Sequence, residues 1–387
     1  MATLNMKTAS EALKLFYLPG LVYQLNNASP FLAAIERDTT SVSGGEIVMA
    51  LRYGRQGGVG NRADDGPLPI PNSRKTRQAR WQTKNIFATI EISDKTIRAS
   101  RSREGAFVSL LEAELSDALE DAKDNLARQV FGDGSGKLMT FKEHTTPTNE
   151  LSVDTVQYIA EGQFIDIIDA NGNTVAERRE VLIVDDINNT ITIDGAPVTT
   201  SDTDFAVLHL NYNQEYTGMA AVFTPDNVLY NIDRKKNKWF NPTVINLNGE
   251  ISEVAIQKAI DEAERKAGGR INFMSASYGV RRAYQDTLLA VKRIVEVMQL
   301  KGGYEAITYN NIPITVDKYN PPQTLFGLDL TTWKEYQLED FTWFDQDGAI
   351  LHRDQNRPVW RATLAKYADL GCNKPRGNFI MTGIVEH

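Results

Sequence analysis

Cysteine and long apolar runs are the features that this 387-residue sequence has least of. Its single cysteine, Cys372, excludes a disulfide within the chain and any metal site built from several cysteines, and it fits a reducing compartment. No run of about 18 apolar residues is present to cross a membrane, and the first residues lack the pattern of a signal peptide. We therefore expect a protein that is made in the cytoplasm and has no contact with a membrane.

Motifs that indicate catalysis are also missing. The four histidines are scattered along the chain without the spacing of metal ligands, and no Gly-x-Ser-x-Gly nucleophile motif occurs. These histidines are His144, His209, His352 and His387. We expect no catalytic residues, no metal and no cofactor, so the sequence does not predict an enzyme.

Two segments partly match ligand-binding motifs, and both have simpler interpretations. In residues 132–138, only three residues separate Gly132 from the final Gly-Lys where a phosphate loop has four, and Leu138 replaces the Ser or Thr. A helix stop explains these glycines better. Residues 169–180 partly match a calcium loop, but Thr174 stands where the glycine belongs. A hairpin turn at Asn171-Gly172 explains the same residues.

Charge is plentiful and segregated along the chain. The net charge is −8, yet Arg52 to Arg103 contains twelve Lys or Arg against four acids, and Leu151 to Glu215 contains twelve acids against two arginines. Patches of opposite sign favour self-association through complementary fields. A basic loop and a solvated acidic domain would give the same counts, so both interpretations stay open.

Residues 44–103 predict a long β-hairpin that runs into a helix. The outgoing arm, residues 46–53, places four apolar side chains on one face, and the return arm, residues 86–92, alternates in the same way. Glycines and prolines fill the tip between residues 54 and 71. Because an isolated two-stranded ribbon is marginal in water, we expect the hairpin to lie on a neighbouring copy of the chain.

The remaining segments have distinct patterns. Residues 1–40 predict an apolar arm that docks on the same subunit or on the next one. Residues 104–131 predict one amphipathic helix about 40 Å long. Residues 151–215 have no helical pattern and predict a small β-barrel or sandwich inserted as a module. From residue 216 onward the pattern is mixed α/β, with a capped helix predicted at residues 251–267.

The order of these parts resembles the major capsid proteins of tailed bacteriophages, which have the Hong Kong 97-like fold. Three local stretches are similar to recurrent segments of that family: residues 229–234 followed by Trp239, residues 271–275, and residues 309–314 leading to Asp317. The resemblance implies an α+β fold with an N-terminal arm, an extended β-hairpin loop, a peripheral domain with a long spine helix and an axial α/β domain. A small all-β domain is inserted into this plan.

The resemblance divides the chain into six parts. They are the N-terminal arm (1–40), the extended loop (41–100), the spine helix of the peripheral domain with its following loop (101–150), the inserted β-barrel or sandwich (151–215), the axial domain (216–347) and the return to the peripheral sheet (348–387).

The resemblance also implies a function. It implies a structural head protein that self-assembles into pentamers and hexamers and forms an icosahedral-type shell around packaged double-stranded DNA. Its implied partners are other copies of the chain, a separate scaffolding protein, a portal, and packaged DNA by non-specific contact. It would be assembled in the host cytoplasm and located in the virion. An encapsulin-like nanocompartment shell is the first alternative, and an oligomeric nucleic-acid-binding protein is a more distant one.

The predicted contacts between subunits pair basic residues of the loop with acidic residues of the helix. They are Arg52, Arg55, Arg62, Arg74, Lys75, Arg77, Arg80, Lys84, Glu112, Asp117, Glu120 and Asp121. The basic residues around Trp81 also suit nucleic-acid binding, but no recognised motif accompanies them, so we favour subunit contacts. Charge reversal at Arg74, Arg77 and Arg80 is expected to block assembly and to leave the subunit folded.

Overall fold

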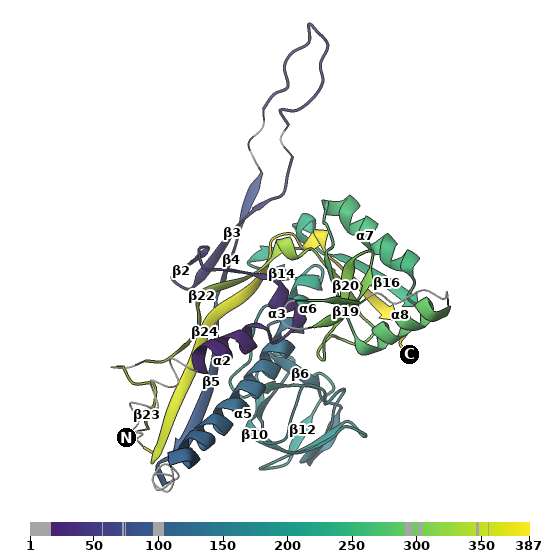
Figure 1. Ribbon diagram of the computed structural model, residues 1–387. Coiled ribbons are helices and arrows are strands. Elements are labelled where there is room, and N and C mark those ends of the chain that lie inside the picture. The colour runs from purple at the N-terminus through teal and green to yellow at the C-terminus, as the bar shows by residue number, and fades with distance from the viewer. Residues whose placement is uncertain are drawn as a thin grey trace.

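Three folded bodies and one projecting hairpin make up the chain (Figure 1). A peripheral domain runs along the left of the view, an axial domain lies to its right, a β-barrel lies below and the hairpin rises above them. The structure is a computed structural model, and it describes residues 17–55, 57–71, 73, 75–95, 104–290, 297–300, 304–345, 348–354 and 356–387. The predicted α+β class with an inserted all-β domain is confirmed.

The peripheral domain is a five-stranded sheet with one long helix packed along it. Helix α5 (Glu104–Phe131) has the bounds that its apolar spacing predicts, and it contacts the sheet and helix α2 (Leu18–Asn26). Leu115, Leu126 and Val130 of α5 are buried, as expected for the inner face of an amphipathic helix. The strands of the sheet are β1 (Glu36–Asp38), β22 (Trp333–Trp343), β24 (Val359–Cys372), β23 (His352–Arg353) and β5 (Lys84–Ser93).

The N-terminal segment packs on its own subunit. Helix α2 and helix α3 (Pro30–Ala34) contribute buried apolar side chains to the peripheral core. These side chains are Leu21, Leu25, Phe31 and Leu32. The predicted arm left open which subunit receives it, and its described part, from residue 17 onward, docks on the same subunit. Residues 1–16 lie outside the described residues.

The hairpin has the outgoing arm that the sequence predicted, but a different return arm. Strand β3 (Glu46–Arg52) pairs with β4 (Thr76–Gln82), and β2 (Val42–Ser43) adds a third strand at its base. The return arm predicted at residues 86–92 is wrong, because those residues belong to β5 and pair with β24 of the peripheral sheet. Strand β4 was not predicted, because only Ala79 is fully buried in it and its sequence shows little alternation of apolar and polar residues.

The inserted module is a closed barrel. Its sheet order is β6 (Lys137–Thr140), β13 (Phe205–Leu208), β9 (Phe164–Ile168), β10 (Thr174–Asp185), β11 (Thr190–Ile193) and β8 (Glu150–Ser152). A bridge between Phe141 and Val153 joins the two edge strands, and the amide of Asp154 donates to the carbonyl oxygen of Thr140 at 3.0 Å. Closure removes the exposed edges that an open sheet would leave.

The barrel begins earlier than residue 151, the predicted start of the inserted domain. Strand β6 starts at Lys137, directly after the glycine loop that ends α5, and it pairs with β13 inside the barrel. Residues 137–150, predicted as a loop of the peripheral domain, therefore belong to the barrel. They were missed because β7 (His144–Thr148), which pairs with β12 (Val198–Thr200), is short and almost entirely polar.

The axial domain is a seven-stranded sheet with two helices packed on it. Helix α7 (Glu253–Ala267) starts at Ser252, whose Oγ accepts the Ala255 amide at 3.2 Å. It ends at Gly268, which has the left-handed φ of 63°. Helix α8 (Tyr278–Ala290) packs on the same core. The strands are β16 (Thr243–Gly249), β25 (Phe379–Ile384), β21 (Leu325–Leu328), β17 (Phe273–Ala276), β20 (Ile312–Val316), β19 (Glu305–Tyr309) and β18 (Val297–Gln299).

The chain passes between the peripheral and axial domains more often than predicted. Strand β22 lies in the range predicted as axial (216–347) but pairs with β24 in the peripheral sheet. Strand β25 lies in the range predicted to return to the peripheral sheet (348–387) but pairs with β16 and β21 in the axial sheet. Helix α6 (Met219–Phe223) also packs in the peripheral core. Alternation predicted a strand at residues 379–384 and none at residues 333–343, and it does not specify which sheet receives a strand.

Candidate subunit interface

The base of the hairpin is fixed to its own subunit. The Trp81 ring of β4 stacks on Tyr230 with centroids 4.1 Å apart and meets Tyr336 of β22 edge-on at 5.6 Å. The amide of Arg80 donates to the carbonyl oxygen of Tyr230 at 3.1 Å. Aromatic pairs in these geometries stabilise beyond their buried area. The hairpin therefore leaves the subunit in a defined direction.

Beyond Tyr53, the described residues of the outer hairpin are mostly exposed. We call residues 53–75, which lie between the ends of β3 and β4, the hairpin tip; it projects well beyond the body in Figure 1. Three apolar side chains of the tip are almost fully in water: Val59, Leu68 and Ile70 are 85%, 86% and 84% exposed. Several exposed apolar side chains on one projecting segment favour a surface that another molecule covers.

The predicted basic contact residues lie mostly on this hairpin and are exposed. Those described with the hairpin are Arg52, Arg55, Arg62, Lys75, Arg77 and Arg80. Arg77 donates to Asn237 Oδ1 at 2.7 Å, and Arg80 donates to Gln78 Oε1 at 2.8 Å. Arg74 lies outside the described residues. Lys84 lies in β5 of the peripheral sheet, where it donates to the carbonyl oxygen of Asn213 at 2.6 Å, so it is not part of the hairpin.

A second basic segment beside the hairpin base was missed in the sequence. Lys235, Lys236 and Lys238 are exposed and lie in the turn whose Asn237 accepts the hydrogen bond of Arg77. Tyr53 of the hairpin stacks on the neighbouring Trp239 with centroids 5.1 Å apart. The run of lysines was visible in the sequence, but nothing there indicated that the fold places it against a hairpin some 160 residues earlier.

The predicted acidic partners are on the spine helix α5. Asp117, Glu120 and Asp121 are exposed, and Glu112 lies in α5 with its side chain outside the described residues. Together with the exposed Glu114, these three described acids form what we call the acidic helix face. The structure therefore places the basic hairpin and the acidic helix face on different parts of one subunit, and among the described side chains it brings no pair of them together.

A cleft of about 480 Å³ separates α5 from the axial domain. Asp124 of α5 forms an ion pair across it with Lys318 at 3.2 Å. Asp317, at the base of the cleft, is buried, and the amide of Tyr319 donates to its Oδ1 at 3.1 Å. Burial raises the pKa of Asp317 to about 6, against the opposing effect of that hydrogen bond.

Replacing Asp317 by Asn is expected to change how stability depends on pH. The pKa of Asp317 is higher in the folded chain than the value of about 3.9 in an unfolded chain. The folded state therefore binds this proton more tightly, and its contribution to the free energy of unfolding falls as pH rises from about 4 to about 6. Urea unfolding of the subunit should show the wild type losing about 2 kcal/mol relative to Asp317→Asn between pH 4 and pH 7. Parallel pH profiles of the two proteins would contradict this assignment.

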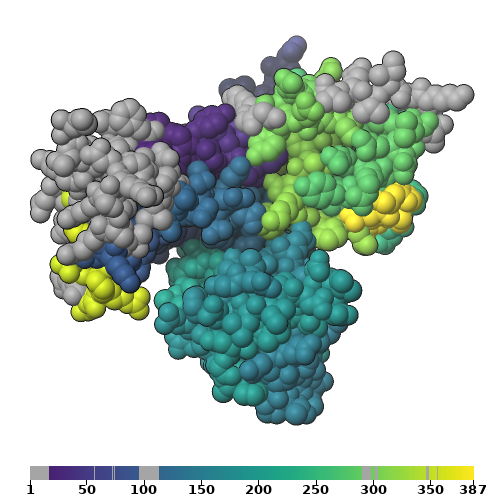
Figure 2. Space-filling view, turned by 60° about the horizontal axis from the view of Figure 1, so that its bottom comes forward, coloured from purple at the N-terminus to yellow at the C-terminus, as the bar shows by residue number. Residues whose placement is uncertain are grey.

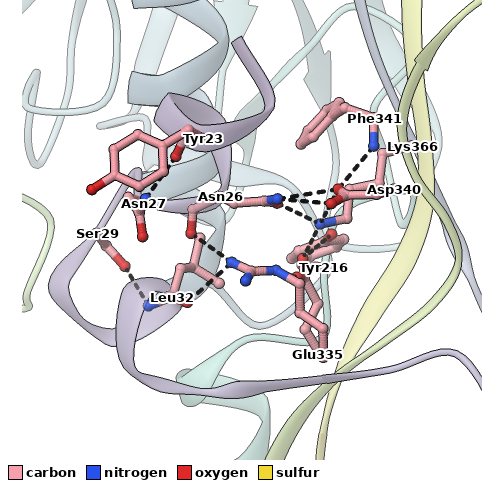
Figure 3. Close-up of polar contacts among 11 residues, drawn as sticks. Tyr23, Asn26, Asn27, Ser29, Leu32, Tyr216, Glu335, Asp340, Phe341 and Lys366 are labelled. Atoms are coloured by element: carbon pink, nitrogen blue, oxygen red, sulfur yellow. Dashed lines mark hydrogen bonds and ion pairs between the residues drawn. The ribbon is translucent and has the colours of Figure 1, made fainter. Parts of the chain in front are cut away.

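A buried polar cluster attaches the N-terminal helices to the peripheral sheet (Figure 3). Lys366 of β24 is only 1% exposed, and its Nζ lies 2.9 Å from Glu335 Oε1 and 2.9 Å from Asn26 Oδ1. Asn26, at the end of α2, donates in turn to Asp340 Oδ2 at 2.9 Å. Arg37 adds a second ion pair to Glu335 at 3.1 Å. A buried charge needs such partners, so the cluster fixes how the N-terminal segment sits on the sheet.

The two segments that partly match ligand-binding motifs are turns. Asp169 accepts hydrogen bonds from the amides of Asn171 and Asn173, both at 2.8 Å, which closes the β9–β10 hairpin. The glycine loop after α5 contains Gly134 with a left-handed φ of 88°, and it leads into a barrel strand. Within the described parts of the chain, no group of His, Cys, Asp and Glu is arranged to hold a metal, and no helix is long and apolar enough to span a membrane.

Solved structures with a similar fold cover nearly the whole chain. The capsid of cyanophage A-1(L) matches 91% of this chain and 90% of its own, with 11% sequence identity and a TM-score of 0.54. The capsid of an empty GTA particle matches 93% of this chain and 91% of its own, with 8% identity and a TM-score of 0.52. The holo-SrpI encapsulin complex from Synechococcus elongatus matches 100% and 99%, with 9% identity and a TM-score of 0.43.

No protein-family model matches the sequence, and no curated protein is similar to it. The similarity to solved structures therefore shows the fold of this chain, which is one found in capsid proteins. More specifically, the hairpin loop, spine helix, peripheral sheet and axial domain make up the Hong Kong 97-like capsid fold, as the sequence predicted.

Proposed function

We propose that this chain is a structural subunit that self-assembles into pentamers and hexamers and closes into an icosahedral-type shell around double-stranded DNA. One observation carries the proposal. The chain has a capsid fold over nearly its whole length, and the apolar side chains at the tip of its projecting hairpin are exposed in the single subunit. An exposed apolar surface of this kind is typical of a protein that contacts other subunits.

In this proposal, the hairpin of one subunit lies on the acidic helix face of the next. The hairpin strands and tip, residues 46–82, contain seven Lys or Arg against three acids, and the acidic helix face presents the opposite charge. An exposed ion pair contributes at most about 1 kcal/mol. A single hairpin contact is therefore weak, and stability comes from repeating it at every subunit of a closed shell.

The partners in this proposal are other copies of the chain, a separate scaffolding protein, a portal, and packaged DNA held by non-specific contact. The subunit would be assembled in the host cytoplasm and located in the virion. Its role is mechanical, with no catalytic step and no cofactor.

The content of purified particles tests the packaged partner. Particles are treated with nuclease, opened, and analysed for nucleic acid and for protein other than the shell subunit. The proposal expects nuclease-protected double-stranded DNA. Particles that hold a protein cargo and no DNA would contradict it and would indicate a nanocompartment shell.

A further inference from the structure

An outer wall of the barrel exposes apolar side chains. Phe164 of β9, Leu182 of β10 and Leu210, which follows β13, are 39%, 48% and 72% exposed. Strand β9 lies between β13 and β10 in the sheet, so these residues come from adjacent strands. Figure 2 shows that the barrel stands out from the rest of the subunit, in teal below the other bodies.

The register of β9 and β10 places their exposed side chains on one face. Phe164 is opposite Glu180. Leu182 points to the same side as Glu180, because Val181 between them is fully buried in the barrel core. The register shifts between Val181 and Ile183, and this bulge leaves Ile183 exposed as well.

Leu210 lies beside this face at the end of β13, where the chain leaves the strand with a left-handed φ of 62°. The amide of the preceding residue, His209, donates to the carbonyl oxygen of Phe164 at 2.9 Å, and the amide of Leu210 donates to Asp166 Oδ2 of β9 at 3.0 Å. The guanidinium of Arg178 covers part of the Phe164 ring at 5.1 Å. We call Phe164, Leu182, Ile183 and Leu210 the barrel wall.

The charge of the barrel limits what can cover this wall. Residues 137–215 contain fourteen Asp or Glu against four Lys or Arg. Two barrels brought wall to wall would place like charges against each other, which disfavours contact. The same charge disfavours DNA, whose phosphates are anionic. A partner that fits must be basic and must present apolar side chains.

The hairpin tip of a second copy has both properties. Val59, Leu68 and Ile70 supply exposed apolar side chains, and Arg55 and Lys75 supply exposed positive charge beside them. The hairpin and the barrel lie at opposite ends of one subunit (Figure 1), so the contact is between copies. A contact between unlike surfaces repeats from copy to copy and closes into a ring when the rotation allows it.

The barrel also follows the helix that carries the acidic helix face. Helix α5 ends at Phe131 and the first barrel strand begins at Lys137, so the acidic helix face leads directly to the barrel. We propose that the hairpin tip of one subunit docks its apolar side chains on the barrel wall of a neighbouring copy. This inference rests on the proposed shell function and assigns the inserted barrel the role of receiving the hairpin.

Site-specific crosslinking of the full chain tests this contact. Ile70→Cys is combined with Leu182→Cys, and particles are treated with a short bismaleimide; the natural Cys372 is fully buried and does not interfere. The expected result is a ladder of covalent oligomers on a denaturing gel. The matched control combines Ile70→Cys with Val254→Cys, another exposed apolar position, on α7 of the axial domain. The control should give at least tenfold less crosslinked product.

A second set of variants tests the same contact without crosslinking. Leu182→Asp with Leu210→Asp is expected to lower the fraction of subunits in particles at least tenfold, measured by sedimentation, with an unchanged thermal unfolding midpoint. Val254→Asp should not lower that fraction. Particles of the Ile70→Cys, Leu182→Cys variant that give no ladder, or a ladder equal to the control, overturn the inference and leave the shell function standing. A wild-type protein that forms no particles under any condition contradicts the shell function itself.

Discussion

Reversing the charge of three hairpin residues is expected to abolish closed shells. The variant Arg52→Glu, Arg55→Glu and Lys75→Glu changes side chains that are exposed and point into solvent in the subunit, so folding should be unaffected. Each reversal replaces an attraction of up to about 1 kcal/mol by a repulsion of similar size. The three changes together amount to roughly 3 kcal/mol or more per contact, a loss of at least about 100-fold in association at each interface. Electron microscopy should show particles in the wild type and none in the variant.

The complementary change provides the control for this experiment. Reversing Asp117, Glu120 and Asp121 to Lys on the acidic helix face should also abolish shells, and combining both sets of changes should restore them, because the pairs then have opposite signs again. Circular dichroism should show a folded subunit in every case. Normal particles from the hairpin variant would contradict the proposed contact between the hairpin and the acidic helix face.

These three hairpin residues test the contact more cleanly than Arg74, Arg77 and Arg80, the residues that the sequence suggested. Arg77 and Arg80 lie at the base of the hairpin, where they donate hydrogen bonds to Asn237 and Gln78 of their own subunit. Reversing them would disturb the base of the hairpin as well as a contact with a neighbour, so the result would have two causes. Arg52, Arg55 and Lys75 separate the two effects.

Replacing Lys366 by Met is expected to destabilise the subunit by about 3 kcal/mol. The Lys366 ammonium is buried beside Glu335, whose side chain is only 4% exposed. Removing the lysine leaves a buried carboxylate without its closest cation, and Arg37 compensates only in part. The loss should appear as a lower urea midpoint with an unchanged slope.

Two comparisons make this result specific to the buried charge. The double variant Lys366→Met with Glu335→Gln removes both charges and should recover part of the lost stability. Arg361→Met breaks ion pairs with Glu91 and Asp354 that lie nearer the surface, and it should cost only about 1 kcal/mol. Equal losses for Lys366→Met and Arg361→Met would show that the buried cluster has no special role.

The elements that the sequence predicted well are those fixed by local patterns. Helix α5 follows from its apolar spacing, and α7 follows from the cap at Ser252 and the left-handed Gly268. The strands were harder, because their pairing depends on partners far along the chain. Strand β5 has the alternation of a hairpin arm, and only the fold shows that β24 is its partner.

The candidate interface was predictable in its charge but not in its arrangement. Segregated charge indicated a basic hairpin and an acidic partner, and the described members of both groups on the hairpin and on α5 are exposed. The lysines at 235, 236 and 238 were missed because they reach the hairpin only through the tertiary fold. Lys366 was missed for a related reason: it lies in β24, much of which is covered on both faces, so alternation does not show that a charged residue is buried there.

Electron microscopy of the purified protein tests the central claim most directly. The account predicts closed shells whose image averages resolve hexamers and pentamers built from this single chain, with the hairpin of each subunit lying across its neighbour. A protein that stays monomeric or forms only small open oligomers at every protein and salt concentration would contradict the claim that this chain builds a shell.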